Sequence, residues 1–152
     1  PEQLELPLNN ATGEWKVIGR FNWGDRPADC ALPIDADSHV FDFWNQTYHR
    51  ASSPLPLSNL LPHSGRLFAV RPVSAGPQFV GSSLHFSQGG EIVEWQGTEH
   101  SLSFVINLNR IAEGFVTLAL PNDPKTPATR LADGICRFPV SVNKRAEVTV
   151  EW

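Results

Sequence analysis

The chain of 152 residues contains no methionine, only two cysteines and no long apolar run. A membrane-spanning helix needs about 20 consecutive apolar residues, so the sequence predicts no such helix. A translated protein begins with methionine, whereas this chain begins at Pro1. We therefore expect a piece cut from a longer protein or, as the alternative, the product of trimming a short leader. Part of the biological activity is then expected to belong to sequence outside this chain.

Positive charge is also scarce. The chain has 12 lysines and arginines against 16 aspartates and glutamates, for a net charge of −4, and its basic residues are scattered. Nucleic acids and anionic membranes are bound by clustered basic residues, so we expect neither as a partner. No glycine-rich phosphate loop leads into a helix, and the histidines lack metal-ligand spacing, so we expect no cofactor and no metal.

The two cysteines, Cys30 and Cys136, are too few for a disulfide framework in a chain of this length. Both fall on positions of strand-like segments that are expected to face the core. Buried free cysteine is common, so two unpaired thiols are expected, with a single bridge as the alternative.

Short segments of alternating apolar and polar residues dominate the sequence, and 13 prolines and 11 glycines separate them. Alternation with a period of two is typical of a strand with one buried face. It is cleanest in residues 101–110, where four apolar side chains should point one way: Leu102, Phe104, Ile106 and Leu108. In residues 14–23 the same pattern predicts a buried face with four members: Trp15, Val17, Phe21 and Trp23.

No segment has a helical period over three turns. The pattern therefore predicts an all-β fold of about nine to twelve antiparallel strands in a two-sheet β-sandwich, Greek-key-like in its connections. We expect one domain spanning residues 1–152. If the domain has an internal joint, the proline- and glycine-containing segment 72–77 is the place for it.

Several short motifs follow one another in a defined order over residues 14–97. They are Phe21-Asn22-Trp23, Asp42-Phe43-Trp44, Leu61-Pro62-His63-Ser64, Val70-Arg71-Pro72, and the group Ser83, His85, Gln88 and Gly89. This order resembles the C-terminal β-sandwich of melibiase-type α-galactosidases. One departure is the single proline of Leu61-Pro62-His63, where the family often has two.

The resemblance implies a non-catalytic accessory domain of a glycoside hydrolase, with Asp42, Phe43 and Trp44 as its structural signature. Its partner would be the catalytic (β/α)₈ barrel of the same parent chain, which this chain lacks. Nothing here matches the catalytic carboxylate motifs of that barrel, so no catalytic residue is assigned. An apolar patch is expected where the barrel was removed, and a homodimer of the isolated chain could cover it.

Asp42 could be read as a catalytic acid, but glycoside hydrolysis needs two carboxylates around a cleft. The interpretation we favour is a buried carboxylate that accepts hydrogen bonds from nearby backbone or from an arginine such as Arg66 or Arg71. Asp35 and Asp37 leave one metal hypothesis open, a calcium site in a loop, since clustered carboxylates suit that cation.

Aromatic residues support the alternative function, an independent carbohydrate-binding module. Sugars stack their apolar faces on exposed rings, and an indole adds an N–H donor. Trp44 and Trp95 are the two tryptophans whose positions favour exposure, and they are the candidate carbohydrate-binding residues. Packing in the core or between domains is the competing role for both, because large aromatics dominate cores and interfaces.

Overall fold

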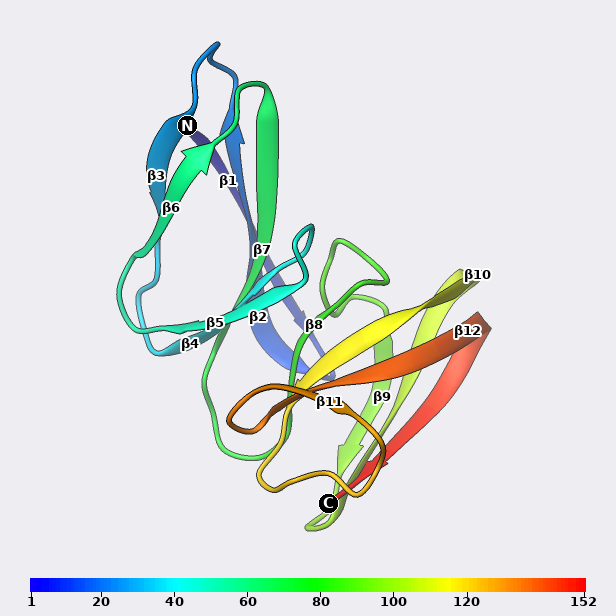
Figure 1. The fold of residues 1–152 in the computed structure, drawn as a ribbon. Coiled ribbons are helices and arrows are strands. Elements are labelled where there is room, and N and C mark those ends of the chain that lie inside the picture. Colours follow the sequence, from blue (N-terminus) through cyan, green and yellow to red (C-terminus); the bar gives the residue numbers. More distant parts are fainter. The chain divides into compact units, whose positions relative to one another are not determined.

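The computed structural model describes residues 1–152 and contains twelve strands and no helix (Figure 1). The strands are β1 (Glu2–Asn10), β2 (Gly13–Asn22), β3 (Ala28–Leu32), β4 (Ser38–Asp42), β5 (Thr47–Ala51), β6 (Leu55–Leu60), β7 (Ser64–Pro72), β8 (Gln78–Ser82), β9 (Ile92–Gly97), β10 (Ser101–Ala119), β11 (Thr129–Ala132) and β12 (Ile135–Glu151). Their sheets are antiparallel, which confirms the all-β class and the expected strand number. The chain has no helix with the length and apolarity needed to cross a bilayer.

The strands group into two compact units. Unit 1 comprises Pro1–Leu8 and Trp15–Val73, and unit 2 comprises Asn9–Glu14 and Ser74–Trp152. The division after Val73 falls inside the segment 72–77, which the sequence analysis named as the place for an internal joint if the chain has one. That residues 1–152 behave as one domain stays a prediction.

Unit 1 contains a five-stranded sheet in the order β1-β2-β7-β4-β5 and a two-stranded sheet of β3 and β6. One apolar core draws side chains from both sheets and from the loop after β3: Ile18, Leu32, Ile34, Val40, Leu57, Phe68 and Val70. Two sheets that share one core in this way are compatible with the predicted β-sandwich.

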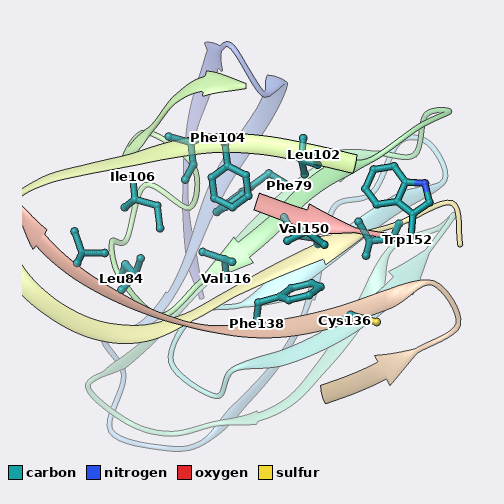
Figure 2. Close-up of a cluster of buried hydrophobic side chains, with 14 residues drawn as sticks. Phe79, Leu84, Leu102, Phe104, Ile106, Val116, Cys136, Phe138, Val150 and Trp152 are labelled. Atoms are coloured by element: carbon teal, nitrogen blue, oxygen red, sulfur yellow. The ribbon is translucent and has the colours of Figure 1, made fainter. Parts of the chain in front are cut away.

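Unit 2 contains a sheet in the order β11-β12-β10-β8, with β9 also paired to β10. The two longest strands, β10 and β12, pair along most of their length. Side chains from both halves of each strand meet in one core, as Figure 2 shows for Leu102 and Phe104 beside Val116 and Phe138. The ribbon of β10 and β12 must therefore bend back on itself to bury one of its faces.

The bend coincides with a change of register in the middle of β10. Asn107 pairs with Arg145, and the next pair is Ile111 with Asn143, so β10 advances four residues where β12 advances two. An insertion of two residues preserves the side to which each side chain points, because the strand period is two. The even-numbered apolar residues of β10 can thus face the core on both sides of the bend, which confirms the buried face predicted for residues 101–110.

Candidate functional site

Asp42 lies at the end of β4 and organises the turn that leads into β5. Its Oδ1 accepts the backbone N–H groups of Trp44 and Asn45, both at 3.1 Å. Its Oδ2 accepts the Asn45 side-chain amide at 2.8 Å and the Arg66 guanidinium at 2.9 and 2.5 Å. The side chain is fully buried, which confirms the prediction of a paired structural carboxylate. With both oxygens occupied, Asp42 is poorly placed to exchange a proton with a substrate.

The turn that Asp42 organises presents an exposed indole. Trp44 is 68% exposed, and its ring meets that of Phe43 edge to face with 4.8 Å between centroids. The backbone beneath it is fixed, since the Phe43 N–H donates to Leu67 and the Phe43 carbonyl accepts the Gln46 amide. Trp44 is therefore a large apolar side chain on an ordered turn, and it is exposed, as the sequence analysis expected.

Trp95 differs from its expected exposure. The sequence placed it on one face with Val93, but it is half-buried against the core rings of Phe79 and Phe104, while Val93 faces outward. A one-residue bulge in β9 is the cause: Glu94 has a φ of 56°, and β9 uses three residues where β10 uses two. The bulge moves Trp95 to the inner face of the sheet. Trp44 and Trp95 thus do not form one exposed pair of rings.

Trp23 corrects a second expectation. It was predicted to be buried with Trp15 and Val17, which are buried, yet Trp23 is 62% exposed. Its ring stacks on that of Phe21 with 1° between the planes and 5.6 Å between centroids. Its Nε1–H donates to a carboxylate oxygen of Glu2 at 2.8 Å, so the exposed indole is held at two points.

Two glycines explain why the Phe21 ring lies close to the backbone of the sheet. Gly65 pairs with Phe21 across β7 and β2, and Gly19 precedes Phe21 by one strand period. A Cβ at Gly19 or at Gly65 would come within 2.6 Å of the Phe21 ring, so that ring lies directly over both backbones. The alternation pattern alone missed this, although the glycines were a readable signal of close approach.

The loop between β8 and β9 contains the serine, histidine and glutamine of the family-like motif. Gln88 is fully buried, and its amide donates to the carbonyls of Ser82 and His85 and accepts the Ser82 N–H. Glu91 is also buried and accepts the Ser82 hydroxyl at 2.7 Å and the Gly89 N–H at 3.0 Å. These side chains hold the loop's own backbone together.

The same loop brings a serine, a histidine and a carboxylate into contact, which raises the question of nucleophilic catalysis. His85 Nδ1 lies 2.7 Å from the Ser87 hydroxyl, and Ser87 lies 3.3 Å from Glu91. In a catalytic triad the acid must hold the second nitrogen of the histidine, whereas Glu91 contacts the serine. The Ser87 N–H also donates to His85 Nδ1. The arrangement suits a tight loop and does not match a triad.

Asp35 and Asp37, the two acids of the calcium hypothesis, do not converge on a common point. Arg50 binds Asp37 through two hydrogen bonds of 2.9 and 2.5 Å, and this ion pair holds the pKa of Asp37 below its usual value. The carboxylate of Asp35 is largely exposed, 4.0 Å from Lys16. No group of three or more histidine, cysteine, aspartate or glutamate side chains is placed to hold a metal ion.

Buried polar groups also lie on the larger sheet of unit 1, on the face opposite Val40 and Val70. Arg71 is buried with its guanidinium 4.7 Å from the centre of the Trp15 ring, and burial lowers the pKa of Arg71 to about 10. On β4, the His39 ring lies 2.9 Å from the Tyr48 hydroxyl, and burial raises the pKa of Tyr48.

Neither a family model nor any curated protein matches the chain. The candidate site consequently rests on geometry: two exposed tryptophans, Trp23 and Trp44, both in unit 1, of which Trp23 has its indole and Trp44 its backbone held by hydrogen bonds. The two cysteines are free, as expected, with Cys136 buried and Cys30 half-buried.

Proposed function

We propose that the chain is the non-catalytic C-terminal accessory β-sandwich of an α-galactosidase-like glycoside hydrolase. Its work would be to pack on a catalytic (β/α)₈ barrel that is absent from this chain, and to stabilise that barrel. The resemblance in motif order supports the proposal. Asp42 and Gln88 support it as well, since the polar atoms of both motif residues form hydrogen bonds that stabilise turns and loops of this fold.

The observation that carries the proposal is the exposure of large apolar side chains on unit 1. Leu4, Leu6 and Trp44 are each more than half exposed. Burying one such side chain completely contributes about 1.5–3 kcal/mol, so leaving several in water favours a partner that covers them. A protein surface of matching shape is such a partner.

The proposal is tested by adding the chain in trans to the parent barrel produced without it. We expect a stoichiometric complex, a higher melting temperature of the barrel, and weaker binding by the Leu4→Ser/Leu6→Ser variant. Ile111→Ser is the matched control, because Ile111 is equally apolar and 75% exposed but lies in unit 2. A barrel that melts at the same temperature with or without the chain, and forms no complex at about 100 μM, would rule the proposal out.

Trp44 favours one second candidate, an independent carbohydrate-binding module. Its indole is exposed, as a ring that stacks on sugar must be, and Asp42 fixes the backbone that carries it. Trp95 does not contribute an exposed ring to this candidate. Calorimetric titration with galactose, melibiose and a galactomannan oligosaccharide tests it: saturable binding that Trp44→Ala abolishes, with circular dichroism unchanged, would support the module over the accessory domain.

A further inference from the structure

We propose that the stacked rings of Phe21 and Trp23 form a carbohydrate-binding platform that is separate from Trp44. The ligand class is an oligosaccharide whose pyranose ring offers one face of C–H groups. This inference does not depend on the packing of a barrel, and it assigns sugar contact to residues that the sequence predicted to be buried.

The first argument is the geometry of the two rings. Phe21 and Trp23 are parallel within 1°, and Phe21 lies over the bare backbone of Gly19 and Gly65. With 5.6 Å between centroids the rings stack as two parallel planes, one on the other, and Trp23 leaves 62% of its surface in water. The face of the Trp23 ring that does not stack on Phe21 is a flat apolar area of the kind that the C–H face of a pyranose requires.

The second argument is that the exposed ring is immobilised. An exposed tryptophan normally samples several rotamers, and fixing them on binding costs about 0.5–1.5 kcal/mol. Trp23 is held by the Phe21 stack and by the 2.8 Å hydrogen bond to Glu2. Ordering the ring in the free protein removes that cost from any later binding step.

The third argument is the polar group at the edge of the platform. Glu2 uses one carboxylate oxygen, Oε2, for the indole N–H, and its Oε1 has no hydrogen bond to the indole. Sugar hydroxyls lie around the rim of the ring whose face stacks, so a carboxylate beside the aromatic plane is placed to accept one. An apolar surface with one polar group at its margin is the usual composition of a small-ligand site.

The test is a two-dimensional NMR titration of the chain with galactose, melibiose, cellobiose and a galactomannan oligosaccharide, following the indole N–H signals. We expect the Trp23 signal, assigned by its loss in Trp23→Ala, to shift in a saturable manner with at least one of these sugars. Trp23→Ala should weaken the affinity about tenfold or more, whereas Trp44→Ala should leave it unchanged.

The Gly65→Ala variant tests the position of the rings, because it leaves both Phe21 and Trp23 in the chain. A Cβ at Gly65 would lie 2.6 Å from the Phe21 ring and must lift it, so we expect weaker sugar binding with Trp23 still present. Circular dichroism and the dispersed amide spectrum report whether each variant is folded. Because Trp23 is largely exposed, Trp23→Ala is expected to fold and to keep the test decisive.

Three outcomes would overturn the proposal. The first is the absence of any indole shift with all four sugars at tens of millimolar. The second is a shift of the Trp44 signal that Trp44→Ala abolishes and Trp23→Ala does not, which would assign sugar contact to the other turn. The third is loss of binding to the parent barrel in Trp23→Ala without any effect of sugars on the Trp23 signal, which would make the platform a protein-docking surface.

Discussion

Replacing Asp42 with asparagine tests whether one buried carboxylate organises the β4–β5 turn. The substitution keeps the shape of the side chain and retains Oδ1 as an acceptor for the Trp44 and Asn45 N–H groups. It changes Oδ2 into an amide that donates hydrogen bonds. That amide would face two donors, the Arg66 guanidinium and the Asn45 amide, without an acceptor between them.

The expected cost follows from the burial of the two partners. Removing one member of a buried ion pair costs about 3–5 kcal/mol, because the other charge is left without compensation. The Asp42 side chain is fully buried, but the Arg66 side chain is 27% exposed and can recover part of its hydration. We therefore expect Asp42→Asn to lower the free energy of unfolding by about 3 kcal/mol, at the lower end of that range.

Urea denaturation followed by circular dichroism measures this loss, and a double-mutant cycle with Arg66→Met isolates the pair. In the double variant neither charge remains unpaired, so its loss should be smaller than the sum of the two single losses by at least about 1 kcal/mol. If Asp42→Asn cost less than about 1 kcal/mol, or if the two losses simply added, the carboxylate would not be the centre of this turn.

Three further predictions concern other parts of the chain. Because burial raises the pKa of the Cys136 thiol and Cys30 is half-buried, iodoacetamide should label Cys30 first, and equal rates by mass spectrometry would contradict this. Arg50 holds the pKa of Asp37 below 3.8, so the stabilisation from this pair is present above pH 3.8 and is lost as the pH falls through the lowered pKa. An NMR titration should therefore place the Asp37 midpoint below 3.8, and Arg50→Gln should return it toward 3.8. Lys144 has a φ of 63°, in the left-handed region that favours glycine, so the Lys144→Gly variant should be more stable than the Lys144→Ala variant by about 1 kcal/mol. Equal stability of the two variants in urea denaturation would show that the backbone is not strained there.

Period-two alternation predicted the buried faces of the long strands because it depends only on which side each residue takes. It held in β10, where the irregularity adds two residues and preserves the side. It failed in β9, where a single extra residue at Glu94 turned Trp95 inward. Nothing in the sequence around Glu94 marks this bulge, since glutamate has no preference for positive φ.

The candidate site was predictable to a different degree at each tryptophan. The rule that a buried carboxylate needs donors predicted that Asp42 accepts from backbone or from an arginine such as Arg66 or Arg71. The structure has both kinds of donor, with Arg66 as the arginine and the N–H groups of the turn under Trp44 as the backbone. The position of the Phe21 ring, on which Trp23 stacks, depends on what lies across the sheet, namely Gly65 on β7. Such a pairing needs the register between β2 and β7, which alternation within one segment does not provide.

Both exposed tryptophans are held by a carboxylate, and this shared arrangement connects stability with binding. Asp42 fixes the backbone beneath Trp44, and Glu2 fixes the indole of Trp23 directly. An indole ordered before a partner arrives loses little entropy on contact, whether the partner is a protein surface or a sugar. Substituting the two carboxylates should have different effects, however. Asp42→Asn should lower stability and disturb the turn of Trp44 together. Glu2→Ala should release the Trp23 indole without unfolding the chain, because Glu2 is exposed. A binding partner that is sensitive to Glu2→Ala at unchanged stability would therefore be a partner of the Phe21–Trp23 platform.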